Sequence, residues 1–240
     1  MGNVFINADD YGMTPEINAA ILQATRERLI HSVSVDVCNE ITRSNAGKLL
    51  AMGISIGLHL NLTEGRPIGN GEGITDLLDT GGRFKPASLG LKSDAELGPV
   101  FFELQHQLEQ FRFYFDREPT HLDSHQHFTY LHPPAFEAML KLATAEDIPI
   151  RSPKPFIQIE SLGNFCERVR SRYGISLALV PEERAAVLKE LFCRYRPRLR
   201  CQDLYLDFDP KVLEQLHLGT TCAEMIVHPH LESVRGVNGI

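Results

Sequence analysis

Several features that mark other classes of protein are missing from this 240-residue sequence. Tryptophan is absent, no apolar run is long enough to cross a bilayer, and no internal repeat is visible. The formal net charge is −7 without any dense lysine and arginine run, which argues against nucleic acid or an anionic membrane surface as a partner. A secretory signal is also not recognisable, because Asp9 and Asp10 interrupt the first apolar run.

The cysteines give no sign of a disulfide framework. Their number is odd and no Cys-x-x-Cys pair occurs among Cys38, Cys166, Cys193, Cys201 and Cys222. Such cysteines are typical of reduced thiols in a protein that stays inside the cell. With no signal peptide and no membrane span, the sequence predicts a cytoplasmic protein.

What the sequence does contain is a repeated alternation of short apolar runs and segments of helical period. Strands are expected over 4–8, 33–38, 54–62, 121–127, 148–151, 204–208 and 223–228, with helices from Thr14, near 101–115, from Pro133, near Glu160 and from Pro181. This alternation predicts an α/β fold with a parallel sheet and outer helices. The length fits a single domain, residues 1–240, built as a (β/α) barrel of seven to eight strands that need not be complete or regular.

One stretch breaks the alternation. Residues 63–93 are rich in glycine and show little periodicity. Loops of this length inside a domain are usually either functional lids or disordered. Because the stretch directly follows a histidine-bearing strand, we expect it to form a lid over the site.

Polar side chains gather where the expected strands end. The segments are Asn7-Ala8-Asp9-Asp10-Tyr11-Gly12, Gly57-Leu58-His59-Leu60-Asn61-Leu62, His121-Leu122-Asp123-Ser124-His125-Gln126-His127 and Val227-His228-Pro229-His230. In an α/β barrel, the carboxyl ends of the strands meet at one mouth, where active sites form. Four strand ends that each deliver Asp or His are hard to explain by packing.

The third of these segments follows the two-residue period of a strand. His121, Asp123, His125 and His127 would share one face, yet at about 3.3 Å per residue they cannot all reach one metal ion. One or two of them would bind the ion. Asp123 is well placed to orient a ligating imidazole, whose second N–H commonly bonds a carboxylate, and His121 is expected to be structural.

Two imidazoles and a carboxylate from separate strands are typical of a catalytic metal site with open positions. The paired Asp9 and Asp10 would allow one carboxylate to bind the metal and the other to accept a proton from water. Each residue also has a plain structural interpretation. The aspartates could cap a helix, His59 could be a buried polar group, and His228 could belong to a polar loop.

In order and spacing, these segments resemble the YdjC-like carbohydrate deacetylase family, which includes chitooligosaccharide deacetylases and HpnK-like proteins. The resemblance rests on 7–12, 57–63, 120–125 and Ile150-Arg151, and extends more weakly to His228. It implies a deacetylase with a barrel-type fold distantly similar to polysaccharide deacetylases.

The resemblance also implies roles for single residues. The family's metal ligands match Asp10, His59 and His125. Its general base matches Asp9 and its general acid matches His228. Arg151 matches a substrate-contacting arginine at the rim. His230 stands where the family usually has glycine, so the acid could be either histidine. Tyr11 is a further candidate for substrate contact.

The sequence therefore predicts metal-dependent hydrolysis of the N-acetyl group of an amino sugar or small oligosaccharide, with one Zn²⁺ or Mg²⁺ ion as cofactor. The resemblance suggests a homo-oligomer. One alternative is a metal-dependent amidohydrolase acting on a non-sugar amide. An aromatic groove formed by Tyr11, Phe84 and Tyr130 would favour the sugar. The other alternative, a non-catalytic metal-bound binding or regulatory protein, would not need Asp9 beside the ligand.

Overall fold

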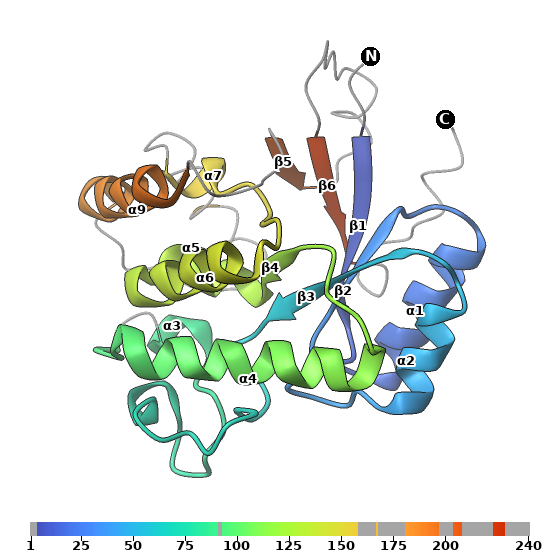
Figure 1. Cartoon of the computed structure of the whole chain (residues 1–240), viewed down its shortest axis with the longest axis horizontal. Helices are drawn as coiled ribbons and strands as arrows, with labels where there is room; N and C mark the ends of the chain where they lie inside the picture. The colour runs from blue at the N-terminus through green and yellow to red at the C-terminus, as the bar shows by residue number, and fades with distance from the viewer. Residues whose placement is uncertain are drawn as a thin grey trace.

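The computed structural model describes residues 4–90, 93–157, 167, 181–196, 204–207 and 223–228. Its strands are β1 (Val4–Tyr11), β2 (Ser32–Val35), β3 (Ser55–Leu60), β4 (Leu122–Ser124), β5 (Leu204–Asp207) and β6 (Ala223–Val227). Its helices are α1 (Pro15–Arg26), α2 (Arg43–Leu50), α3 (Ala87–Gly90), α4 (Leu97–Phe115), α5 (Phe128–Leu131), α6 (Pro133–Glu146), α7 (Lys154–Ile157) and α9 (Pro181–Tyr195), with 3₁₀ turns η1 (Thr75–Leu77) and η2 (His125–His127). Figure 1 shows the strands at the centre with the helices around them.

The strands form one parallel sheet in the order β4-β3-β2-β1-β6-β5. The predicted α/β class with a parallel sheet is confirmed. The predicted barrel of seven to eight strands is not confirmed. The described residues form six strands, and the expected strand over 148–151 is reduced to one bridge between Ile150 and Leu122. A parallel sheet still brings all its carboxyl ends to one edge, which is what a shared site requires.

The first helix forms where the sequence predicts it. Thr14 has extended backbone angles and its side chain accepts a hydrogen bond from the Ile17 amide, while Pro15 occupies the first helical position. Ile17 and Ile21, one turn apart, are buried against the sheet. Helix α2 was not predicted, because its eight residues include only a short apolar pattern.

Helices α4 and α6 pack against each other on one side of the sheet. Helix α4 forms where a helix is expected near 101–115, and Leu104, Leu108, Phe111 and Phe115 on it are buried. Their spacing of three or four residues, about one turn, places these side chains on the same face of the helix. Their burial stabilises the fold by roughly 1.5–3 kcal/mol for each large apolar side chain.

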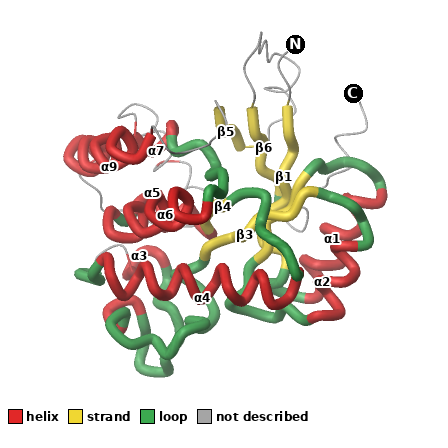
Figure 2. Tube along the Cα trace, in the orientation of Figure 1, coloured by secondary structure: helices red, strands yellow, loops and turns green. Residues whose placement is uncertain are grey.

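The glycine-rich segment 63–90 is mostly loop and lies beneath α4 in Figure 2. It is nonetheless packed, with Ile74, Leu77 and Phe84 buried. The carboxylate of Glu103 on α4 accepts hydrogen bonds from the amides of Ile68 and Gly69, at 3.0 and 2.9 Å. The segment is therefore tied to α4 at its beginning. Its function as a lid stays a prediction.

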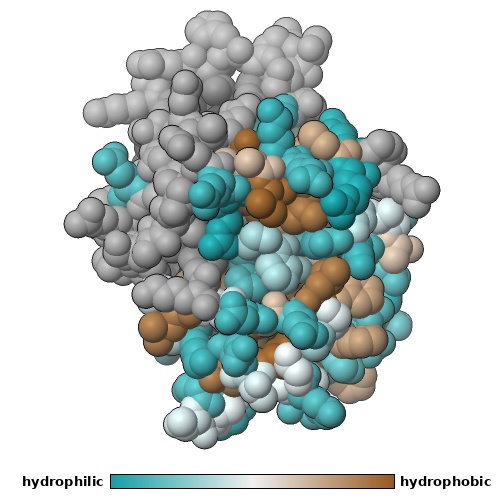
Figure 3. All heavy atoms as spheres, turned by 90° about the vertical axis from the view of Figure 1, so that its left-hand side faces the viewer, coloured by the Kyte–Doolittle hydropathy of each residue, from teal (hydrophilic) through white to brown (hydrophobic). Residues whose placement is uncertain are grey.

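The outer surface is mixed in character. On the face shown in Figure 3, hydrophobic atoms form separate patches among hydrophilic ones wherever the surface is coloured. Within the described residues, no helix is long and apolar enough to span a membrane.

Candidate metal centre and active site

Asp10 reaches the sheet edge through an irregular backbone. The register between β1 and β2 shifts between Ala8 and Tyr11, and Asp10 itself has a φ of 76°. This left-handed conformation costs a non-glycine residue about 1–3 kcal/mol and is found preferentially at functional sites. The shift allows Asp9 and Asp10 to point into the same buried region while the strand continues.

Three side chains from three strand ends meet there. The Asp10 Oδ1 atom lies 2.9 Å from His125 Nδ1 and 3.3 Å from His59 Nε2. Asp10, His59 and His125 are all buried, and their ligand atoms lie within 4.8 Å of one another. The structure thus brings together the three residues that the resemblance assigned as metal ligands. A carboxylate oxygen and two imidazole nitrogens at this separation fit a divalent ion with open coordination positions.

The electrostatics of this group suit a cation. Burial disfavours the charged form of His125, but the Asp10 carboxylate outweighs it and raises the pKa of His125 to about 9. The pKa of His59 is also raised, because Asp123, Asp9 and Asp10 overcome its burial. Burial alone would raise the pKa of Asp10, but the two histidines lower it by more, so the pKa of Asp10 lies well below its ordinary value. The site therefore favours positive charge beside Asp10, whether carried by protons or by a metal ion.

A buried carboxylate fixes the orientation of His59. Its Nδ1 donates to Asp123 Oδ1 at 2.7 Å, which leaves Nε2 directed at Asp10. The predicted orienting role of Asp123 agrees with this geometry. Gly57, two residues earlier on β3, leaves room for the ring of His121, with which any Cβ there would collide.

The segment after Leu122 differs from the long strand that was predicted. Strand β4 ends at Ser124, and Gln126 and His127 have φ values of 49° and 56°. The two-residue alternation ends there, so the prediction that His127 shares the face of Asp123 is wrong. The His127 ring lies instead against Phe156, with 5.4 Å between ring centroids. His121 bonds Ser34 and Thr120 and lies outside the Asp10 group, in agreement with its expected structural role.

Beneath the metal group lies a set of fully buried charges, here called the site floor: Asp9, Asp123, Arg151 and Glu224. Arg151 donates two hydrogen bonds to Asp9, at 2.9 and 2.7 Å, and one to Glu224, at 2.8 Å. It also lies 2.5 Å from Asp123. Its side chain is 0% exposed, so the prediction of a substrate-contacting arginine at the rim is wrong. Three carboxylates offset the cost of burying one guanidinium.

The hydrogen bonds between Asp9 and described residues leave an acceptor position on one of its oxygens. Oδ1 accepts from both Arg151 and the Asn7 side chain, whereas Oδ2 accepts one hydrogen bond from Arg151, and a carboxylate oxygen can accept two. An Asp9 oxygen also lies within 4.8 Å of ligand atoms of His59 and Asp123. Asp9 therefore lies next to the metal group without belonging to it.

His228 and Glu64 lie on the solvent side of the metal group and are here called the site mouth. His228 directly follows β6, is 16% exposed, and its Nε2 lies 3.8 Å from Asp10 Oδ2. Glu64 follows β3, is 50% exposed, and its Oε2 lies 3.3 Å from His125 Nε2. His230, the alternative acid, lies outside the described residues.

The aromatic residues proposed for the substrate groove do not form one. Tyr11, Phe84 and Tyr130 are all buried. The Tyr11 hydroxyl donates to the Asn45 carbonyl, and burial raises its pKa to about 12. The prediction of Tyr11 as a substrate contact is therefore wrong, because its ring fills the core beside α2.

Four buried or half-buried residues of the site were not predicted: Ser34, Asp36, Glu64 and Glu224. Ser34 accepts a hydrogen bond from Asn7 and donates one to Asp123, and Asp36 binds the Asn61 side chain. Ser34 and Asp36 lie within the strand predicted over 33–38, where polar residues among apolar ones were a usable signal. Glu224 offered none, because it pairs with Arg151 across 73 residues of sequence.

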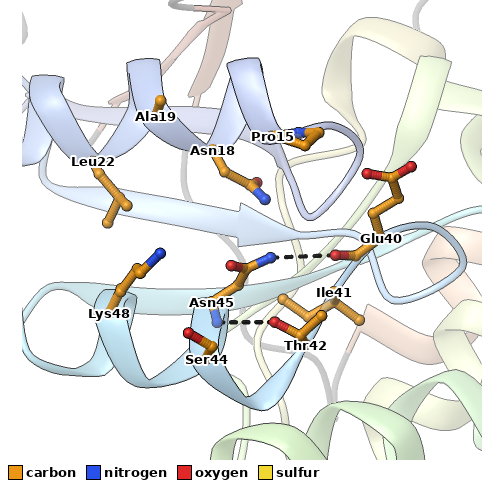
Figure 4. Close-up of a pocket in the computed structure, with 10 residues that line it drawn as sticks. All are labelled: Pro15, Asn18, Ala19, Leu22, Glu40, Ile41, Thr42, Ser44, Asn45 and Lys48. Atoms are coloured by element: carbon orange, nitrogen blue, oxygen red, sulfur yellow. Dashed lines mark hydrogen bonds between the residues drawn. The ribbon is translucent and has the colours of Figure 1, made fainter.

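A separate hollow of about 720 Å³ lies between α1 and α2. Figure 4 shows that Asn18, Asn45 and Lys48 line it, and that Asn45 bonds the carbonyl of Glu40. None of the metal-binding group lines this hollow. We assign it no part in the site.

The fold and the site define this protein as a parallel α/β protein with a candidate metal centre of one carboxylate and two imidazoles at its strand ends. Within that class, the chain belongs to the YdjC-like family, whose model, described as YdjC-like protein, matches residues 3–237.

Curated relatives are named for deacetylation of carbohydrates. A carbohydrate deacetylase of Clostridium beijerinckii is 28% identical over 208 residues, 85% of this chain and 82% of the relative. A human carbohydrate deacetylase is 38% identical over 128 residues, 51% of this chain and 39% of the relative. A chitooligosaccharide deacetylase of Yersinia pestis is 29% identical over 161 residues, covering 66% and 62%. Most of these matches thus span less than two thirds of the relative's length.

A solved structure supports the fold. A putative cellobiose-phosphate cleavage protein of Enterococcus faecalis superposes with a TM-score of 0.72 at 21% identity. The match covers 95% of this chain and 80% of that protein. At this identity the likeness establishes the shared architecture and nothing about the reaction.

Proposed function

We propose that this protein hydrolyses the N-acetyl group of an amino sugar or small oligosaccharide and releases acetate. The observation that carries the proposal is the buried group of Asp10, His59 and His125 at three strand ends. The names of the family's relatives, carbohydrate and chitooligosaccharide deacetylase, supply the substrate class.

A divalent ion held by these three residues would polarise the amide carbonyl and make water a better nucleophile. Two imidazoles and one carboxylate are ligands that suit Zn²⁺, whereas Mg²⁺ usually binds more oxygen atoms. We therefore expect Zn²⁺ to bind more tightly than Mg²⁺.

The remaining roles fall to residues on the two sides of the group. Asp9 is the proposed general base, because it lies beside His59 and is held in one orientation by Arg151. His228 is the proposed general acid, because it reaches the group from the mouth and could protonate the leaving amine. An acid and a base from opposite sides suit an amide substrate placed between them.

The test is acetate release from a panel of N-acetylated mono- and disaccharides by protein loaded with Zn²⁺ or Mg²⁺. Chelator-treated protein is the first control, and His59→Ala protein the second. The proposal predicts release that is lost on chelation and restored by metal. If the metal-loaded protein releases no acetate from any N-acetyl sugar but cleaves a non-sugar amide, the substrate is a non-sugar amide and the proposed sugar substrate is wrong. Failure on both would favour a non-catalytic metal-binding protein.

A further inference from the structure

The second ring nitrogen of His125 has a partner that the reaction scheme does not use. His125 Nδ1 faces Asp10, and His125 Nε2 lies 3.3 Å from Glu64 Oε2. We propose that Glu64 is a positioning residue: it accepts the Nε2 proton of His125 in a hydrogen bond and so presents the Nδ1 lone pair to the metal. This inference rests on the metal site of the proposed function.

The two histidines of the group would then bind the ion through different nitrogens. His59 donates its Nδ1 proton to Asp123 and directs Nε2 at Asp10. His125 is turned the other way, with Nδ1 toward Asp10 and Nε2 toward Glu64. A carboxylate on the outer nitrogen fixes the tautomer and orientation of a ligating imidazole, and raises its basicity. Glu64 would do for His125 what Asp123 does for His59.

Glu64 is half-exposed, but its backbone is fixed by buried side chains. The Asn61 Oδ1 atom accepts hydrogen bonds from the amides of Thr63 and Glu64, at 2.9 and 3.0 Å. Asn61 in turn donates to Asp36 Oδ2 at 2.6 Å, and its amide donates to the Gln107 side chain at 3.0 Å. An exposed glutamate would ordinarily sample many rotamers. Here the buried anchor fixes the backbone from which the Glu64 side chain reaches His125.

A direct ligand role for Glu64 fits the geometry less well. The group whose ligand atoms all lie within 4.8 Å of one another contains Asp10, His59 and His125 but not Glu64. Glu64 contacts the nitrogen of His125 that faces away from Asp10. It therefore acts on the ion through His125.

The experiment measures the Zn²⁺ affinity of the 240-residue chain by competition with a chromophoric chelator. The variants are Glu64→Ala, Glu64→Gln and, as a matched control, Glu72→Ala, which removes an exposed glutamate from the same segment. We expect Glu64→Ala to weaken Zn²⁺ binding by about tenfold, the lower end for loss of an outer carboxylate. Glu64→Gln keeps an acceptor oxygen and should recover part of the affinity, and Glu72→Ala should match the parent protein.

A second readout identifies the ligating nitrogen. In the Zn²⁺-loaded protein, ¹⁵N NMR of histidine should show the metal on His125 Nδ1 and a proton on Nε2. An affinity of Glu64→Ala within twofold of the parent, or a Zn²⁺ ion on His125 Nε2, would overturn the inference while leaving the metal site intact. A parent protein that binds no Zn²⁺ would instead overturn the proposed function.

Discussion

The floor and the mouth of the site are built in opposite ways. The floor residues Asp9, Asp123, Arg151 and Glu224 are at most 3% exposed, and Arg151 contacts all three carboxylates. The mouth residues His228 and Glu64 are 16% and 50% exposed, and each lies near one residue of the metal group. Many contacts in low dielectric fix the geometry of the floor. Under the proposed function, the partial exposure of the mouth residues would let a substrate approach the metal group from that side.

Because of this difference, we expect substitutions in the floor and at the mouth to affect different properties of the protein. A change in the floor should alter both stability and chemistry, because buried charges depend on one another. A change at the mouth should alter affinity or turnover with little effect on folding. The predictions that follow use this distinction, from the largest expected effect to the smallest.

The largest effect is expected for the neighbouring aspartates. Asp9→Asn should keep the metal but lower turnover by about 10²–10⁴, the usual contribution of a general base. Asp10→Asn should lose the metal, because Asp10 lies within 3.3 Å of both ligand histidines. Metal content and acetate release are measured together, with Asp79→Asn as an exposed control. If Asp9→Asn protein is nearly as active as the parent, Asp9 is not the general base.

The next effect concerns the stability of the floor. Arg151→Met leaves three buried carboxylates without their shared partner, and we expect a loss of about 3–5 kcal/mol in unfolding free energy. Arg112→Met removes an ion pair with Glu118 and Glu146 on the surface, where the side chain of Arg112 is 33% exposed. That pair should contribute less than about 1 kcal/mol. Similar losses in urea unfolding of both variants would contradict the comparison.

At the mouth, His228→Ala should lower turnover of an N-acetyl amide by about 10² while leaving metal content unchanged. An amine leaves poorly without a proton, so the loss should shrink for an activated ester. His106→Ala, an exposed histidine on α4, is the control. If His228→Ala slows amide and ester equally, or lowers metal occupancy, His228 is not the acid. His230→Ala, measured alongside, would then show whether the neighbouring histidine has that role.

The smallest effect is a pH dependence of metal binding. Burial opposes protonation of His125, but Asp10 raises its pKa to about 9, so protons compete with the ion below that pH. A ligating imidazole must be neutral, and Zn²⁺ affinity should therefore rise by about tenfold per pH unit between pH 7 and 9. Affinity that stays level across this range would show that the metal-free site is not protonated.

The metal group and His228 could be predicted from the sequence, whereas Glu64 at the mouth and the pairing of Arg151 with Glu224 in the floor could not. Asp10, His59 and His125 each stand in a short polar segment after an apolar run, so strand ends alone place them at one edge. The role of Arg151 depends on Asp9, 142 residues away, and no local pattern records that pairing. The alternation over 121–127 failed at Gln126, because a left-handed turn in a non-glycine residue leaves no signal in the sequence.

The number of strands shows the same limit. Apolar runs identified the segments of all six described strands, although β4 is shorter than expected, and the run at 148–151 became a single bridge beside β4. Tyr11 was misjudged for a related reason. Tyr11 adjoins Asp9 and Asp10 in sequence, yet the backbone irregularity at Asp10 turns its ring into the core.

Metal stoichiometry across three histidine variants tests the central claim most directly. We predict one divalent ion per chain in the parent protein, and strongly weakened binding in His59→Ala and His125→Ala, because a three-ligand site cannot lose an imidazole. His121→Ala should still bind one ion, since His121 bonds Ser34 and Thr120 rather than Asp10. Equal loss of metal from all three variants, or full occupancy in His59→Ala, would contradict the assigned site.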